Sequence, residues 1–143
     1  MGRRSQHAPD ELRALILAAT RDIVEANGVA GLSARHVAKE IGYAPGTLYN
    51  MFVNLDDILL RVEAGTLGEL TRQLEADIAD VSGPDAVRIY ARRYMTFAHA
   101  RPRLWSMLQE HFLPPNAALP DWYLARQSEL CQLLEKPLQP QIG

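Results

Sequence analysis

The chain has 143 residues, of which 48% are hydrophobic and 7% aromatic, and its formal net charge is −2. No segment of the sequence approaches the roughly 20 consecutive apolar residues that a membrane-spanning helix needs, so we exclude a membrane protein. No apolar segment follows the basic Arg3-Arg4 pair, which excludes a secretory signal, and the single Cys131 excludes an internal disulfide. We therefore expect an all-α cytoplasmic protein without a cofactor or a metal.

The first helix is predicted for residues 10–27, with Asp10 as its N-cap and Gly28 directly after its end. Its apolar stripe is expected to comprise Leu12, Ile16, Ala19, Ile23 and Ala26. Residues 1–9 precede this helix as a tail. The arginines in the tail are either solvated or reach the phosphates or the minor groove of a nucleic acid.

Residues 32–52 predict two short helices joined by a tight turn. Ser33 is a suitable N-cap for the first of them, and Val37, Ala38 and Ile41 give that helix an apolar side. Gly42 ends it, because glycine adopts a left-handed φ without steric cost.

The second short helix is expected to begin at Pro45, where a missing N–H is harmless. Leu48 and Phe52 lie four residues apart and would face inward. The outward positions are then Thr47, Tyr49 and Asn50. This arrangement is a helix-turn-helix, in which the second helix enters the major groove of DNA.

These residues also resemble a known family. Gly42, then Gly46-Thr47-Leu48-Tyr49, then Phe52 is similar to the pattern in the N-terminal DNA-binding domain of TetR-type (tetracycline-repressor-like) transcriptional regulators. The flanks agree, with Gly28-Val29 before the motif and Asp56-Asp57-Ile58-Leu59 after it. The resemblance is close over residues 12–60 and architectural beyond them.

Three residues of the first short helix are candidates for DNA contact. By the resemblance, Arg35 at its exposed start can reach the groove, where arginine grips guanine O6 and N7 with two hydrogen bonds. His36 and Lys39 are candidates for contacts to the DNA backbone. The alternative for Arg35 and Lys39 is a solvated surface position.

Four residues of the second short helix complete the predicted DNA interface. Thr47 can donate to a phosphate or touch a thymine methyl, and the Tyr49 hydroxyl suits a phosphate. Asn50 can form hydrogen bonds to adenine through its side-chain amide. Pro45 is the first residue of the helix and would lie beside the groove. The alternative for Tyr49 is a half-buried aromatic that packs against its own fold.

The charge of this region weakens its case as a DNA binder. Residues 1–54 contain six basic side chains against five acidic ones, which are Arg3, Arg4, Arg13, Arg21, Arg35 and Lys39 against Asp10, Glu11, Asp22, Glu25 and Glu40. The sequence also departs from the family pattern at Ala44, at Met51 and at Asn54-Leu55-Asp56, and each departure removes a plausible phosphate contact. Because the salt dependence of binding follows the number of neutralised phosphates, we expect weaker and less salt-sensitive binding than a typical member shows.

The second half is predicted to consist of four further helices. They cover residues 56–80, 84–100, 103–112 and 121–134, with Asp121 as the N-cap of the last one. A break at residues 81–84 and a proline-rich loop at residues 113–120 separate them. The helix at 84–100 is expected to present Val87, Ala91, Tyr94 and Ala98 along one face, with Tyr90 and Phe97 beside it.

The resemblance implies that helices of the second half enclose a small-molecule effector. The residues assigned to its site are Leu67, Tyr94, Phe97, Trp105, Phe112 and Trp122. The alternative is that these bulky residues are plain core. His99 and His111 are possible polar contacts, and neither has a cysteine or carboxylate at metal-ligand spacing, so no metal is expected.

We therefore predict a DNA-binding domain at residues 1–54 and a partial helical effector-binding and dimerisation domain at residues 55–143. The resemblance implies a ligand-responsive repressor that binds a double-stranded DNA operator, as a homodimer when two further C-terminal helices are present. The alternative is a helical ligand-binding or protein-interaction module that has lost DNA binding. We predict no enzyme, since the sequence has neither a catalytic triad spacing nor a phosphate-binding glycine loop after a strand.

Overall fold

The computed structural model describes residues 7–111, 113–114 and 117–136, and within those ranges it contains seven helices and no strand. The helices are α1 (Pro9–Asn27), α2 (Ala34–Ile41), α3 (Pro45–Met51), α4 (Leu55–Asp77), α5 (Pro84–Ala100), α6 (Pro102–Glu110) and α7 (Asp121–Glu135). No helix in this part of the chain is both long and apolar enough to cross a bilayer. The predicted all-α fold is confirmed.

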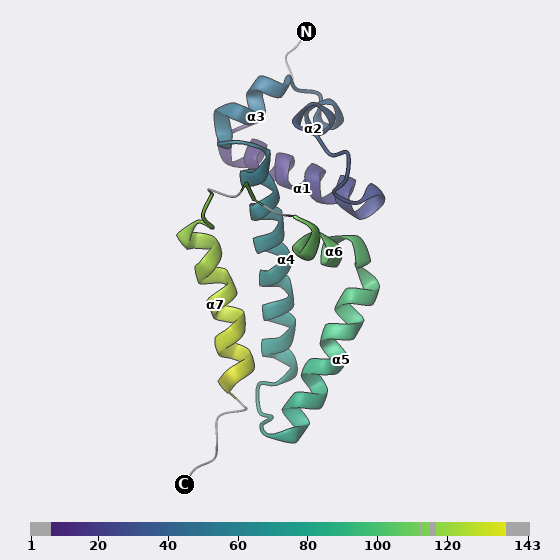
Figure 1. The fold of residues 1–143 in the computed structure, drawn as a ribbon, viewed down its shortest axis with the longest axis vertical. Coiled ribbons are helices and arrows are strands. Elements are labelled where there is room, and N and C mark those ends of the chain that lie inside the picture. The colour runs from purple at the N-terminus through teal and green to yellow at the C-terminus, as the bar shows by residue number, and fades with distance from the viewer. Residues whose placement is uncertain (1–6, 112, 115–116, 137–143) are drawn as a thin grey trace.

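Helix α4 is the element around which the others pack. In Figure 1 helices α1–α3 lie at one end of it, and α5 and α7 flank the rest of its length. With 23 residues, it is about 35 Å long at the usual helical rise. Ile58 packs against the first three helices, Val62 against α1 and α6, Leu67 against α7, and Leu70 against α5. One helix therefore connects every layer of the molecule.

The first three helices, which we call the head, close around an apolar core (Figure 1). Its buried residues are Ile16, Ile23, Ala34, Val37, Ala38, Leu48 and Phe52, joined by Ile58 of α4. The predicted core of α1 is correct at Ile16 and Ile23 and wrong at Ala26, which is exposed. Ala26 lies in the last turn of α1, beyond the last α1 residue that this core contains.

The predicted helix caps are confirmed at one start and wrong at two others. The Ser33 hydroxyl accepts a hydrogen bond from the His36 N–H at 3.1 Å and caps α2 as expected. Asp10 does not cap α1, because the helix already begins at Pro9, a residue suited to a first helical position. Asp121 is likewise the first residue of α7, and Pro120 precedes it without any side-chain cap.

The predicted inner face of α5 is rotated relative to the observed one. Buried on this helix are Ala86, Tyr90 and Phe97. Val87 and Tyr94, which we expected on the inner face, are each 47% exposed. The observed set (Ala86, Tyr90 and Phe97) and the expected set (Val87 and Tyr94) each have the spacing of one face of a helix. The pattern of apolar residues alone therefore does not show which set is buried. The choice is made by α4, α6 and α7, which cover the side that carries Tyr90 and Phe97.

Polar contacts fasten α5 to its neighbours. The Arg93 guanidinium donates to both carboxylate oxygens of Asp77 at the end of α4, at 2.6 and 2.9 Å. These hydrogen bonds hold the pKa of Asp77 below its usual value. The Tyr90 hydroxyl donates to the Leu133 carbonyl of α7 at 2.7 Å. Helices α4, α5 and α7 are thereby tied together at the end far from the head.

Candidate nucleic-acid interface

Helices α2 and α3 form the predicted helix-turn-helix. Helix α2 ends at Gly42, whose φ of 76° and ψ of 29° are left-handed, and the N–H of Gly42 bonds back to the Lys39 carbonyl at 3.3 Å. Helix α3 begins at Pro45 after Ala44, which provides no side-chain cap. The turn therefore has the geometry that a glycine followed by a helix-initiating proline predicts.

The inner side of this unit is fully packed. Leu48 is completely buried and Phe52 is 3% exposed. The Arg13 guanidinium of α1 lies 4.6 Å from the centre of the Phe52 ring and also donates to the Met51 carbonyl at 3.4 Å. Helix α3 is thus held from beneath by apolar contacts and from its C-terminal end by a cation–π contact. A helix of seven residues would not persist alone, so this packing keeps it in place.

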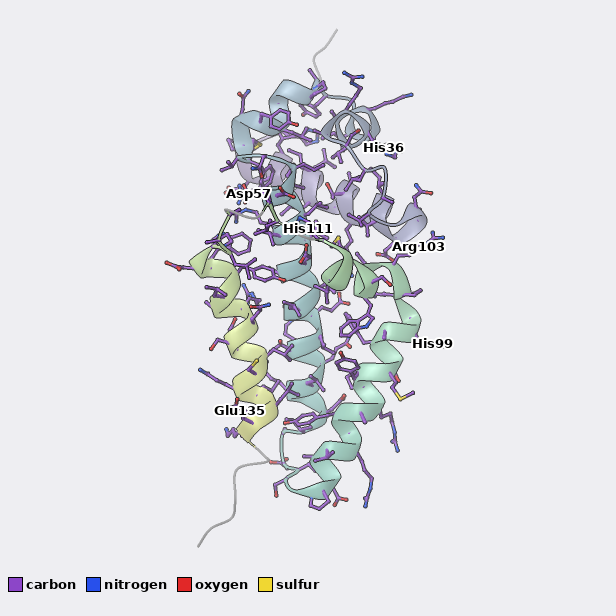
Figure 2. The ribbon with its side chains drawn as sticks, viewed as in Figure 1. His36, Asp57, His99, Arg103, His111 and Glu135 are labelled. Carbon is purple, nitrogen blue, oxygen red and sulfur yellow. The ribbon has the colours of Figure 1, made fainter. Side chains whose placement is uncertain are left out.

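The predicted DNA-contacting residues lie on the side of α2 and α3 that this core leaves uncovered. Exposed among them are Arg35, Lys39, Pro45, Tyr49 and Asn50, and partly buried are His36 and Thr47. Figure 2 shows His36 at the outer end of the molecule, away from α4. Tyr49 is 52% exposed, which favours a contacting role over the packing alternative.

The cations of the head divide into structural and exposed ones. Arg13 contacts Phe52, and Arg21 pairs with Glu25 at 3.4 Å and with Glu69 of α4 at 3.1 Å. Within the described ranges Arg35 and Lys39 form no ion pair. The predicted contacts of Arg3 and Arg4 lie outside the described residues. Two exposed cations on this face are few for a protein that must neutralise DNA phosphates.

One residue beside the predicted face was missed by sequence reasoning. Tyr43 lies in the turn between the two helices, and its hydroxyl lies 2.5 Å from Nδ1 of His7. The tyrosine is partly buried and borders the start of α3. Its place between Gly42 and Pro45 is a signal that could have identified it, because turn residues before a recognition helix lie close to DNA.

The passage from α3 into α4 is fixed by hydrogen bonds. The Asn54 side chain accepts from the Asp57 N–H at 2.8 Å and caps α4. The Asp57 carboxylate accepts from the Val53 N–H and from the Arg61 guanidinium, both at 3.0 Å. Asn54, which departs from the family pattern, thus helps to set the orientation of α4 relative to α3.

The predicted effector residues fall into two groups on different sides of α4. Trp105 of α6 meets Tyr94 and Phe97 of α5 edge to face, with ring centres 4.6 and 6.4 Å away. Leu67 and Trp122 lie between α4 and α7. Phe112 is outside the described residues. The structure therefore brings Tyr94, Phe97 and Trp105 together. It separates them from Leu67 and Trp122.

A buried polar cluster in the second half was only partly anticipated. His111, which follows α6, contacts the carboxylates of Glu63 and Asp56 on α4. The Tyr123 hydroxyl of α7 donates to Glu63 at 3.1 Å. Glu63 lies on the apolar stripe of α4, four residues from both Leu59 and Leu67, and that position was the missed signal of its burial. In the described part of the chain no group of histidines, cysteines and carboxylates is arranged to hold a metal.

Residues 16–62, which include α2, α3 and the start of α4, match the sequence model of the bacterial regulatory proteins of the tetR family. This segment is therefore similar in sequence to a TetR-type DNA-binding domain. The matched segment contains the helix-turn-helix and the core beneath it. The match therefore supports the interpretation of α2 and α3 as a helix-turn-helix of the TetR type.

Two solved structures resemble this chain in fold. The fatty acid degradation regulator FadR from Bacillus halodurans matches with a TM-score of 0.57 and 17% identity, over 85% of this chain and 62% of FadR. A TetR-family transcriptional regulator from Haemophilus influenzae matches with a TM-score of 0.53 and 23% identity, over 82% of this chain and 71% of that one. The chain thus spans less than two thirds of the length of FadR.

Proposed function

We propose that this protein is a ligand-responsive transcriptional repressor that reads a double-stranded DNA operator with α3 in the major groove. The observation that carries the proposal is the two-sided character of α2 and α3. One side is sealed into the head core, and the other presents arginine, lysine, tyrosine and asparagine to solvent. These are the residue types that contact phosphates and base edges.

Each exposed residue has a proposed task. Arg35 bonds a guanine through O6 and N7, and Asn50 bonds an adenine through its amide. Thr47 and Tyr49 donate to phosphates and fix the register of α3, with Pro45 at the groove end of the helix. His36 and Lys39 are assigned to the backbone on the α2 side.

Regulation is proposed to pass through α4. Effector binding among the helices of the second half, at residues of the two aromatic groups, tilts α4 and with it the head. Helix α6 supports this route because it packs on α1 through Leu104 and Met107, and the Arg103 guanidinium donates to the Ala26 carbonyl in the last turn of α1 (Figure 2). The effector must bind one orientation better than the other to change DNA affinity.

A homodimer is part of the proposal, because one helix-turn-helix covers one half-site. Two heads at a fixed separation would read two half-sites about one DNA turn apart. A change in the tilt of α4 in each copy would change that separation and release the operator.

The second candidate is a ligand-binding or protein-interaction module without DNA binding. It is favoured by one observation, the small number of exposed cations on the head. Arg13 and Arg21 are engaged inside the protein, which leaves Arg35 and Lys39 on the presented face of the described chain. A DNA-binding measurement separates the two candidates.

The test is fluorescence anisotropy with duplexes from the region directly upstream of the gene, for the parent chain and for Arg35→Ala. We expect saturable binding that non-specific competitor DNA does not displace, and a loss of about 1–3 kcal/mol in the variant. Arg92→Ala is the matched control, since it removes the same charge from an exposed position of α5 far from the head. Equal binding by both variants would remove Arg35 from the interface.

A salt series sharpens the same experiment. The slope of log affinity against log salt is about −0.9 for each neutralised phosphate. With few exposed cations per head, a shallow slope is expected. A slope that requires about eight or more phosphates would contradict the expectation that this chain binds DNA more weakly and with less salt sensitivity than a typical member of the family. Absence of any specific binding would favour the second candidate.

A further inference from the structure

The buried cluster beside α4 places both nitrogens of one imidazole against carboxylates. Nε2 of His111 lies 2.8 Å from Oδ1 of Asp56, and Nδ1 contacts Oε2 of Glu63. The side chain of His111 is 6% exposed and that of Glu63 is 3% exposed. Figure 2 shows His111 beside α4, between the head and the start of α7.

Two hydrogen bonds to carboxylates require two N–H groups on the His111 imidazole. A neutral imidazole carries one N–H and one lone pair, so it can donate to only one carboxylate. The imidazolium carries two N–H groups and satisfies both contacts. Loss of one proton to solvent would leave a nitrogen lone pair facing either Asp56 or Glu63, and a buried contact of that kind is repulsive.

The surrounding groups leave this histidine as the cation of the cluster. On α4, Arg61 pairs with Asp57 and its guanidinium lies over the Trp122 ring at 4.3 Å. On α7, the Tyr123 hydroxyl contacts the other oxygen of Glu63. On the α1 side of α6, Arg21 and Arg101 pair with Glu25 and Glu69. Among the residues that the structure describes, the positive group that contacts the two carboxylates of the cluster is therefore His111.

We propose that His111 is a proton-dependent clasp that holds α7 and the end of α6 on α4. The clasp joins three helices, because His111 follows α6, Asp56 and Glu63 belong to α4, and Tyr123 belongs to α7. When the imidazolium loses a proton, the buried Glu63 carboxylate loses the positive charge that balances it. Opening of α7, which exposes Glu63 to water, then costs less free energy. This inference concerns the second half itself and does not require DNA binding.

The direction of the effect follows from linkage. Hydrogen bonding to Glu63, opposed by burial and aided by Asp56, raises the pKa of His111 above its usual 6.5. A group with a raised pKa in the folded state stabilises that state fully below the unfolded pKa, and the contribution is lost as pH rises through the folded pKa. The clasp is therefore closed in mild acid and opens on the alkaline side of 6.5.

The position of the clasp links it to the head. Asp56 lies in the first turn of α4, between the residues joined by the Val53–Asp57 and Asn54–Asp57 hydrogen bonds that orient α4 against α3. A proton released at His111 thus changes the contacts of the same helical turn that supports α3. The device makes the docking of α7 responsive to pH.

The first test is a nuclear magnetic resonance titration of the histidine ring protons in the unmodified chain. We expect the midpoint of His111 to lie above 6.5, the usual value for a histidine. A midpoint at or below 6.5 would overturn the proposal, and this measurement needs no variant that must fold.

The second test is hydrogen exchange of the α7 amides as a function of pH, corrected for the intrinsic exchange rate. In the unmodified chain the protection of α7 should fall by up to about tenfold per pH unit above 6.5, since one unit of pKa difference is a tenfold change in the opening equilibrium. His111→Gln keeps a polar side chain without a titrating proton and should flatten this dependence. His99→Gln is the control and should retain it. The same pH dependence in all three proteins would overturn the clasp.

Discussion

The head and the second half distribute their polar and apolar residues in opposite ways. In the head the buried set is apolar apart from Thr20, whose hydroxyl donates to the Ile16 carbonyl within α1. In the second half Glu63 is buried, while Val87, Tyr94 and Met95 of α5 are exposed. The head is a closed core with a polar outer face. The second half holds a charged cluster inside and carries an apolar strip outside.

The difference reflects the distance in sequence over which each half forms its contacts. The head core joins residues 16–58, and its helices follow one another along the chain. The second half depends on pairs such as Tyr123 with Glu63, which are 60 positions apart. Sequence patterns predict contacts between consecutive helices well. Contacts between residues far apart in the sequence depend on which helix covers which face of its neighbour.

The largest expected effect tests the observed face of α5. Phe97→Ala removes a ring that is 4% exposed and packs against Trp105, so we expect a loss of about 3–5 kcal/mol in the free energy of unfolding. Tyr94→Ala removes a ring that is 47% exposed, and its expected cost is about 0.5–1.5 kcal/mol from the stacking on Trp105. Urea denaturation followed by circular dichroism measures both.

The reverse order of the two variants would place Tyr94 inside and Phe97 outside. It would restore the face that the apolar pattern first suggested and contradict the packing of α5 described above.

A smaller effect compares one helix start in each half. Ser33→Ala removes the hydroxyl that caps α2, and we expect a loss of about 1 kcal/mol. Asp121→Ala removes a first-turn residue of α7 that makes no cap, so its free energy of unfolding should stay within about 0.5 kcal/mol of the parent. Equal losses in the same denaturation experiment would show that Asp121 caps α7 after all.

Most of the fold was predictable because its signals are local. Gly42, Pro45 and Ser33 specify the turn, start and cap of the helix-turn-helix within a few residues of where they act. The apolar stripe of α4 is a local signal of the same kind, because Leu59, Val62, Leu67, Leu70 and Leu74 recur at helical spacing, and all of them are buried.

The remaining features required partners that sequence patterns do not place. The face of α5 depends on α4, α6 and α7 rather than on α5 alone. The role of His111 depends on Glu63 and Asp56, which precede it by 48 and 55 positions. The DNA-contacting residues were placed on an exposed face as expected, and their contacts with DNA remain a prediction.

The exposed side of α2 and α3 is the surface that we propose binds DNA. The most direct measurement is a titration of the ¹⁵N-labelled chain with its upstream duplex, followed through the backbone amide resonances. We expect the amide resonances of Arg35, Thr47, Tyr49 and Asn50 to shift most, while those along the exposed apolar strip of α5 keep their positions. Shifts confined to α5 or α7, with α2 and α3 unchanged, would contradict the proposal.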